Sequence, residues 1–394
     1  MKFDQYDVVI VGAGAAGMMT AAEAGKRGRR VLLIDHAQVA GEKIRISGGG
    51  RCNFTNVNTS AKQFLSDNPH FCISALKRFS ALDFIKRVQA RNIAYHEKTL
   101  GQLFCDGPSQ QIIDMLLDDL QAANVRLRME TNVDEISKSE GGFHLRLSTG
   151  PVECTSLVIA TGGKSIPKMG ASAFGYRVAE QFGLKVTETR PALVPLTFEP
   201  MILERLKGLS GVSVEAVVSH GKVRFREALL FTHRGLSGPA ILQISSFWRE
   251  GDEIAINLTP DVNAFDKLRE ARQVSGKQEP QTVLARFLPK ALAQFIAASS
   301  GVTGHLADCS DKKLMAVGDA VNNWRIKPSG SEGYRTAEVT HGGVSTEALD
   351  QKTMQAKTVP GLYFIGEVVD VTGWLGGYNF QWAWSSGWVA GQVV

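Results

Sequence analysis

Three glycines near the start of the chain have the spacing of a phosphate-binding turn. Gly12, Gly14 and Gly17 lie in the segment Gly-Ala-Gly-Ala-Ala-Gly. The first glycine permits a tight turn, the second leaves room for a pyrophosphate, and the third lets a helix pack closely on a strand. Asp35 follows Gly17 by 18 residues and can accept hydrogen bonds from ribose hydroxyls. These residue types predict a site for a dinucleotide.

The elements around this motif agree with a dinucleotide-binding unit. Residues 6–11 are apolar and β-branched, which predicts a buried parallel strand. Helix formers occupy residues 18–26, and a second apolar strand is expected over residues 30–34, directly before Asp35. The alternative, a glycine-rich turn in an unrelated α/β domain, is disfavoured because strand, helix and acid all agree. The acid favours FAD or NAD over NADP, whose ribose carries a phosphate.

A second glycine-rich segment follows the predicted ribose acid. Three consecutive glycines, at 48–50, lie between the cations Lys43, Arg45 and Arg51, which suits close approach of the backbone to an anionic ligand. The alternative is a flexible surface loop. Cys52 follows this run, and it either approaches a bound flavin or is an inert buried thiol. The sequence has neither a second strand-glycine-helix motif nor a Cys-x4-Cys pair near the first, so a redox-active disulfide is not expected.

Two apolar strands far along the chain also end in glycine turns. Residues 157–161 run into Gly162-Gly163, and residues 361–365 run into Gly366-Glu367. A helix that begins near Asn379 would direct free N–H groups at the N1–C2=O end of a reduced flavin, which carries negative charge. The tryptophans of this region are expected to pack in the core rather than to stack on a flavin; they are Trp374, Trp382, Trp384 and Trp388.

The order of these motifs resembles the bacterial flavoproteins of the BaiN/YhiN type, a group that includes aminoacetone-oxidase-like enzymes. The resemblance covers essentially the whole chain. It implies an α/β fold, in which an FAD-binding domain of the two-dinucleotide-binding, Rossmann-like type is interrupted by an inserted, mostly antiparallel β-barrel and a small helical subdomain. The segments that carry it are GAGAAG, SGGGRCN, ATGG, FTHRGLSGP, THGGV, GLYFIGE and GGYNFQWAWSSG.

By position, the resemblance implies a set of FAD contacts along the chain. Glu367 stands where many FAD families carry Asp. The pyrophosphate, adenosine and flavin contacts implied are Gly12, Gly14, Ala15, Ala16, Gly17, Asp35, His36, Lys43, Ser47, Gly48, Gly49, Gly50, Arg51, Cys52, Asn53, Val133, Thr161 and Gly162, and those near the ribityl chain and isoalloxazine are Gly366, Glu367, Asp370, Gly376, Gly377, Tyr378 and Asn379.

The remaining elements suggest a discontinuous domain organisation. Apolar periodicity predicts amphipathic helices over residues 73–91 and 108–123. From Arg190 onward, short alternating strands predict an antiparallel insert, followed by a polar helical segment. The expected FAD-binding domain is 1–190 with 341–394, the inserted β domain is 191–260 with 321–340, and the helical subdomain is 261–320.

Composition excludes several classes of protein. The 394 residues are 44% hydrophobic and 21% charged, which is typical of a globular protein of two or three domains. The net charge of +5 is spread along the chain, so no stable nucleic-acid partner is expected. Five scattered cysteines predict neither a disulfide framework nor a metal site. Without a membrane-length apolar stretch or a secretory segment, the expected location is the cytoplasm, away from membranes.

These observations predict an FAD-dependent oxidoreductase that transfers hydride between flavin N5 and a small organic substrate. Two reactions stay open: oxidation of an amine with return of electrons to oxygen, and reduction of a C=C bond with NAD(P)H as a transient donor. His233 is a candidate acid or base, although a histidine bonded to backbone in a glycine turn is favoured there and at His341. The alternative function, a non-catalytic or RNA-associated flavin-binding protein, draws on the isoelectric point of about 8.9. The substrate, the catalytic residues and the oligomeric state do not follow from the sequence.

Overall fold

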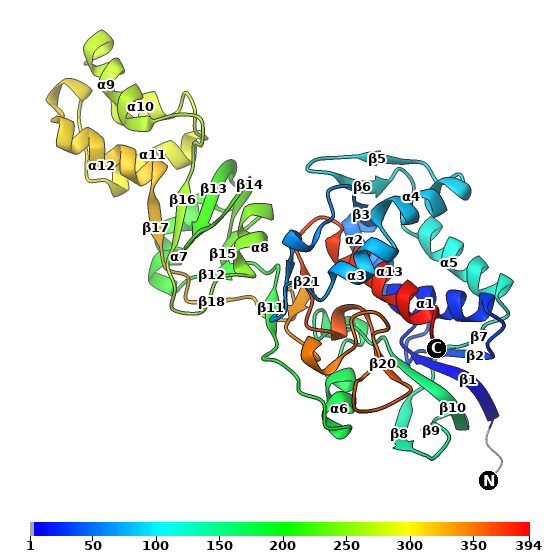
Figure 1. Ribbon diagram of the computed structural model, residues 1–394. Helices are drawn as coiled ribbons and strands as arrows, with labels where there is room; N and C mark the ends of the chain where they lie inside the picture. The colour runs from blue at the N-terminus through cyan, green and yellow to red at the C-terminus, as the bar shows by residue number, and fades with distance from the viewer. Residues whose placement is uncertain (1–3) are drawn as a thin grey trace. The chain divides into compact units, whose positions relative to one another are not determined.

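The computed structural model describes residues 4–394, which form two compact units (Figure 1). The first unit contains the described residues up to Arg190 together with residues 339–394, and the second contains residues 191–338. The strand-rich and helical parts of the insert both belong to the second unit.

The first unit is built on a parallel sheet that an antiparallel hairpin extends. The strand order is β7–β2–β1–β10–β9–β8, and β20 pairs with β10. Parallel pairing joins β7, β2, β1, β10 and β20, whereas β9 and β8 are antiparallel. The bounds are β1 Asp4–Val11, β2 Val31–Ile34, β7 Arg126–Arg128, β8 Val133–Lys138, β9 Phe143–Leu147, β10 Gly150–Ile159 and β20 Leu362–Phe364.

The carboxyl ends of four parallel strands meet at one edge of this sheet. Val11, the last residue of β1, pairs with Ile34 of β2 and with Ile159 of β10, and Ile159 pairs with Phe364 of β20. The turns that follow these strands therefore come together, as they do at ligand-binding edges of open α/β sheets. Those turns contain the sequence-predicted Gly12, Asp35, Thr161 and Gly366.

Glycines allow the first and last helices of the unit to pack closely. A Cβ on Gly387 of α13 (Tyr378–Gly391) would lie 2.5 Å from the Ala16 carbonyl oxygen of α1 (Ala15–Lys26). The Thr20 hydroxyl donates to the Gly387 carbonyl oxygen at 2.8 Å. The other helices of the unit are α2 Glu42–Gly50, α3 Ile73–Arg78, α4 Ala81–Ala90, α5 Gln110–Ala122 and α6 Phe174–Gln181.

The single helix expected over residues 73–91 is wrong, because the structure breaks it into α3 and α4. Phe79 adopts an extended conformation, and Ser80 caps the second helix. The Ser80 hydroxyl accepts from the Asp83 amide, and the Asp83 carboxylate accepts from the Ser80 amide at 2.9 Å. This reciprocal capping box satisfies amides that would otherwise lack partners, so it starts a new helix within a continuous apolar pattern.

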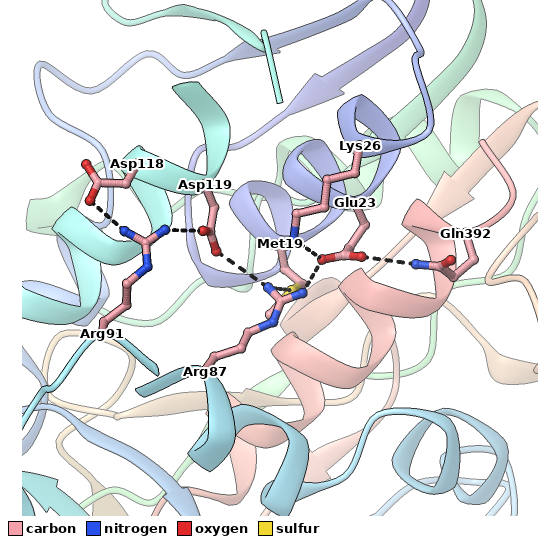
Figure 2. Close-up of polar contacts among 8 residues, drawn as sticks. All are labelled: Met19, Glu23, Lys26, Arg87, Arg91, Asp118, Asp119 and Gln392. Carbon is pink, nitrogen blue, oxygen red and sulfur yellow. Dashed lines mark hydrogen bonds and ion pairs between the residues drawn. The ribbon is translucent and has the colours of Figure 1, made fainter. Parts of the chain in front are cut away.

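An ion-pair network joins helices α1, α4, α5 and the end of α13 (Figure 2). Glu23 on α1 binds Lys26, Arg87 and Gln392. Burial raises the pKa of the Glu23 carboxyl, but Arg87 and Lys26 more than offset that effect and hold it below its usual range. The network continues from Arg87 to Asp119. It ends in the bonds from Arg91 to Asp118 and Asp119 (Figure 2).

The second unit contains a seven-stranded sheet of antiparallel pairs, with four helices, α9–α12, gathered beyond the β16–β17 end (Figure 1). The antiparallel pairing agrees with the prediction from the sequence. The sequence also predicted a barrel, in which the strands form a closed ring, whereas the hydrogen-bonded order of this sheet has two end strands, β17 and β18. In order, the strands are β17 Trp324–Ile326, β16 Ile254–Asn257, β13 Ser213–His220, β14 Val223–Thr232, β15 Gly235–Ser237, β12 Leu196–Thr197 and β18 Gly330–Ser331, and the helices are α7 Pro200–Leu206, α8 Pro239–Ser245, α9 Ala264–Ser275, α10 Pro280–Leu284, α11 Lys290–Ser299 and α12 Asp311–Asn322.

Short strands complete the chain. A three-stranded sheet orders β3, β6 and β5, and β4 pairs with β21. In the second unit, Ser237 lies in β15, and Gly238 is the capping residue of α8, directly before Pro239. The bounds are β3 Asn53–Asn56, β4 Phe64–Leu65, β5 Tyr95–Glu97, β6 Gln102–Cys105, β11 Arg190–Ala192, β19 Val339–His341 and β21 Thr372–Gly373.

Candidate cofactor site

The three glycines of the first turn have different structural roles. Gly12 has φ +111°, and a Cβ there would lie 2.4 Å from the Ala160 carbonyl oxygen. A Cβ on Gly17 would lie 1.8 Å from the Gly12 carbonyl oxygen. By contrast, a Cβ on Gly14 would meet no atom within 4 Å. The first and third glycines are therefore required by packing, whereas Gly14 borders open space at the start of α1.

The start of α1 is suited to an anion. Gly14 is the capping residue, and it has no side chain that could accept a hydrogen bond from the first turn of the helix. Ala15 and Ala16 are the first helical residues, and amides at this position have no partner within the helix. Together with the helix dipole, they provide a positive end that favours phosphate.

Asp35 connects the end of β2 to the glycine turn. Its carboxylate accepts from the Ala13 amide at 2.7 Å and from the Ala37 amide at 2.9 Å. Nδ1 of His36 lies 3.2 Å from the same carboxylate, and a Cβ on Gly170 would lie 2.0 Å from Nε2 of His36. The carboxylate keeps further lone pairs, so it can still accept from ribose hydroxyls.

The second glycine segment begins as a helix and then turns. α2 starts at Glu42, Ser47 leaves the helical conformation, and Gly48 and Gly49 are left-handed with φ +57° and +66°. A Cβ on Gly49 or Gly50 would meet no atom within 4 Å, so this backbone is open to a ligand. The loop expected from Ser47 is thus a tight left-handed turn that leads into β3.

Cys52, at the end of this turn, is fully buried. Burial raises the pKa of its thiol to about 12, despite a hydrogen bond with Ser47. A neutral thiol is a poor nucleophile, so Cys52 has the properties of a structural cysteine. Arg51 is exposed, and the side-chain amides of Asn53 and Gln102 lie 3.2 Å apart.

One carboxylate joins four separate segments at the edge of the sheet. Glu367 accepts from Nζ of Lys43 at 2.8 Å, from the Ser165 hydroxyl at 2.9 Å and from the Thr340 amide at 2.9 Å. Burial raises the pKa of Glu367, but Lys43 and the two other donors more than offset it and hold the pKa below its usual range. Gly162 lies beside the Lys43–Glu367 ion pair, because a Cβ on it would be 3.7 Å from the Glu367 carboxylate.

The sequence missed two members of this cluster. Lys43 and Glu367 were predicted as separate cofactor contacts, whereas Ser165 and Thr340 were not predicted at all. Thr340 belongs to the Thr-His-Gly-Gly segment that the sequence singled out only as a family motif. Nothing in the spacing of these residues shows that a single carboxylate connects them.

Asp370 is a second acid of the same region and is almost fully buried, with 2% exposure. Its carboxylate accepts from the Asp67 amide at 3.0 Å. Burial, which that hydrogen bond only partly offsets, raises the pKa of Asp370 to about 6. The carboxyl is therefore harder to ionise in the folded chain than in the unfolded chain.

This pKa predicts a pH-dependent effect of Asp370→Asn. A carboxyl whose folded pKa is raised opposes folding once the pH exceeds its unfolded value, and the cost is complete above the folded pKa of about 6. We expect the asparagine variant to unfold several degrees higher than the parent at pH 8, since each 1 kcal/mol of relieved cost shifts the midpoint of a domain of this size by about 2–4 °C. At pH 4 the two thermal midpoints should agree. A stabilisation equal at both values would contradict this assignment.

The last glycine turn leads into α13. Gly377, with φ +94°, precedes the helix, and no side chain caps it. Asn379 folds back on its own loop, accepting from the Gly373 amide at 2.8 Å and donating to the Gly373 carbonyl oxygen at 2.9 Å. The ring of Tyr378 packs edge-on against Phe64. Gly376 is held through its carbonyl oxygen, which accepts from Asn56 at 2.9 Å.

Two of the tryptophans pack in the core, as predicted. Trp382 is 1% exposed and Trp384 is fully buried, and their indole N–H groups donate to the carbonyl oxygens of Gly366 and Phe54. Trp384 also stacks on Phe84 with ring centroids 4.3 Å apart. These bonds fix α13 against the turn after β20.

Two predicted residues lie away from the central turns. Val133 begins β8 and pairs with Leu147; the adjoining Thr131 amide donates to the Asp35 carbonyl oxygen at 2.8 Å, so this strand starts near the ribose acid. His233 lies in the second unit, in the turn between β14 and β15. The hydroxyl of Thr161, at the edge of the first unit, is a buried atom without a hydrogen-bond partner among residues 4–394.

These features fit FAD. The turn at Gly14 and the turn at Gly49 and Gly50 present open backbone to a pyrophosphate, and α1 adds an uncapped amino end. Asp35 offers a ribose acceptor, and the unpartnered Thr161 hydroxyl is free for a ligand. When bound, FAD supplies hydride transfer at its isoalloxazine ring.

Comparison with known proteins assigns the family. A family model described as the HI0933-like protein Rossmann domain matches residues 6–393. The chain belongs to this family. As a HI0933-like protein, it is an FAD-dependent oxidoreductase. Within residues 4–394, no helix combines the length and apolarity needed to cross a membrane.

Three relatives of this HI0933-like chain match it over nearly their whole length. A protein of Escherichia coli named ribosomal RNA dihydrouridine synthase is 54% identical and covers 99% of this chain and 98% of its own. A protein of Haemophilus influenzae with the same name is 44% identical, with 98% of each chain covered. A Clostridium scindens protein named 3-dehydro-bile acid delta(4,6)-reductase is 25% identical, again over 98% of each chain.

Solved structures support the fold. A 3-ketosteroid delta1-dehydrogenase from Sterolibacterium denitrificans superimposes with a TM-score of 0.53 and covers 99% of each chain. The sequences are 14% identical, so this likeness concerns the arrangement of elements alone.

Proposed function

We propose that this chain reduces a carbon–carbon double bond, and that the bond is C5=C6 of a uracil base in ribosomal RNA. The observation that carries the proposal is chemical agreement among the full-length relatives. Dihydrouridine is uridine saturated across C5 and C6, and a delta(4,6)-reductase by name also saturates C=C bonds. The 54% identity over 99% of the chain favours the RNA base over a steroid.

The proposed cofactor contacts are those that the sequence predicted at the edge of the first unit. The amides at the start of α1 and the open turn at Gly49 and Gly50 hold the pyrophosphate, and Asp35 holds the adenosine ribose. Glu367 is proposed, as the sequence predicted, near the ribityl chain, and its carboxylate also orders the neighbouring turns by accepting from Lys43, Ser165 and Thr340.

Saturating the bond adds two hydrogens, so the reaction needs an electron donor. We propose NAD(P)H, which becomes NAD(P)+ as its hydride equivalent reaches one carbon of the double bond and a proton from solvent or an acidic side chain reaches the other. The sequence left amine oxidation open as the alternative; the reductase and synthase names of the relatives favour reduction. The proposed substrate, ribosomal RNA, differs from the expectation from the sequence, which was a small organic substrate and no stable nucleic-acid partner.

Two measurements test this function. The purified flavoprotein, mixed anaerobically with NADH or NADPH, should lose its flavin absorbance near the visible maximum. Ribosomal RNA from a strain that lacks this chain should then gain dihydrouridine, detected by mass spectrometry of the digested nucleosides, whereas RNA from the parent strain should gain little. Flavin reduction by amines with release of peroxide, and no dihydrouridine, would instead establish the oxidase.

A further inference from the structure

A cluster of cations lies at the sheet edge opposite the candidate cofactor site. The segment between α1 and β2 contains Lys26, Arg27, Arg29 and Arg30, all exposed, and Arg126 is exposed at the start of β7. We call these five residues the Arg29 surface. They lie at the same end of the sheet, because the last turn of α1 approaches residues 123–125, which lead into β7: a Cβ on Gly25 would lie 2.5 Å from the Ala123 carbonyl oxygen.

Part of this charge is already engaged. Lys26 pairs with Glu23 at 3.0 Å (Figure 2), and Arg27 donates to the carbonyl oxygens of Gly391 and Val394. The Arg30 guanidinium lies 5.7 Å from the centre of the Tyr6 ring. Arg29 and Arg126 form no ion pair with any residue of 4–394. Arg27 and Arg30 have neutral partners, whereas Glu23 offsets the charge of Lys26. The surface therefore presents the unpaired guanidinium groups of Arg29 and Arg126 beside two further guanidinium groups without an acidic partner among the described residues.

The Arg29 surface cannot serve a ligand confined to the cofactor edge. Arg30 directly precedes β2 and Asp35 directly follows it, so about 16 Å of extended chain separates them. A single nucleotide at the Asp35 edge does not span this distance. A long polyanion that passes around the unit does.

We propose that the Arg29 surface binds the phosphate backbone of the RNA substrate outside the reacting nucleotide. This inference rests on the proposed function. Guanidinium groups bind phosphate through two parallel hydrogen bonds, and phosphate contacts position a nucleic acid without reading its bases. The surface thus adds affinity for a structured ribosomal RNA and none for a short piece of it.

The test compares Arg29→Ala/Arg126→Ala with the parent holoenzyme. The matched control, Lys77→Ala/Lys86→Ala, removes two exposed cations from α3 and α4. Binding to a ribosomal RNA fragment and to a uridine-containing trinucleotide is measured over a range of salt. For the fragment, the first variant should bind about tenfold more weakly at low salt, and the slope of log K against log salt should fall by up to about 2. The trinucleotide and the control variant should show no change.

The outcomes separate this inference from the function on which it rests. If the parent enzyme neither binds nor modifies the fragment, the proposed function fails. If the parent binds and the Arg29 surface variant keeps its slope, the RNA follows another path and this inference is overturned. Binding of the parent to phosphatidylglycerol vesicles but not to RNA, lost in the variant, would also overturn it. Equal flavin content and equal unfolding midpoints verify folding, and Arg29→Ala alone, which leaves β7 intact, repeats the test.

Discussion

Replacing Gly14 with valine is expected to give a folded chain whose affinity for FAD is at least about 100-fold lower, a loss of about 2.7 kcal/mol. The backbone of Gly14 is extended, with φ −85° and ψ −168°, which valine adopts readily. Its Cβ would meet no protein atom within 4 Å, so the new side chain would fill space that the pyrophosphate needs. The ratio of flavin to protein absorbance after reconstitution with excess FAD measures the effect.

Two further variants make this result specific. Gly141→Val places the same side chain at another glycine with open surroundings, in the turn between β8 and β9, and should keep full flavin content. Gly12→Ala should instead impair folding, because its φ of +111° and the Ala160 carbonyl oxygen at 2.4 Å leave no room for a Cβ. Normal FAD binding by Gly14→Val would place the pyrophosphate elsewhere.

Replacing Lys43 with methionine is expected to destabilise the first unit by about 1–3 kcal/mol at pH 7.5, because it leaves the Glu367 carboxylate buried without its cation. In the parent, the lowered pKa means that the ionised carboxylate adds stability above the unfolded pKa, which is lost as the pH falls through the folded pKa. In the variant, burial without Lys43 raises that pKa, so the ionised form opposes folding. The difference between parent and variant should therefore be widest near pH 7.5 and shrink toward pH 4.

Urea unfolding at both pH values, without added FAD, provides the measurement. Lys43→Met/Glu367→Gln is the matched control: it removes the charge as well as its partner, so it should recover most of the lost stability at pH 7.5. If the double variant is as unstable as Lys43→Met, the loss comes from packing of the lysine stem and not from the unpaired carboxylate.

The sequence predicted those parts of the fold that depend on local signals. The β1–α1–β2 unit follows from an apolar run, a glycine turn and an acid, each of which acts within a few residues. Helix α13 begins at Tyr378, one residue from the predicted Asn379. The break between α3 and α4 was missed because the apolar period continues through it, while the capping box of Ser80 and Asp83 decides the backbone.

The candidate site was harder to predict because its polar contacts join distant segments. Glycines at the correct spacing identified the turns, yet the sequence assigned Glu367 and Lys43 independently to the cofactor. Their pairing across 324 residues, and the addition of Ser165 and Thr340, depend on the tertiary fold. The side-chain amide of Asn379, by contrast, makes a local contact, because it bonds to Gly373 within its own loop.

The close packing of α1 on α13 has a consequence for the order of folding. The bond between Thr20 and Gly387 joins residues 367 positions apart, and the entire second unit is inserted between them. During synthesis, α1 is made early, and the surface on which α13 packs stays uncovered until that last helix has been made. Such contacts between distant residues give the unit a high contact order and slow assembly. A ligand that binds the assembled unit but not its precursors would shift the equilibrium of this late step toward the assembled unit by mass action. Flavin supply in the cell would then control how much of the newly made chain reaches its native state.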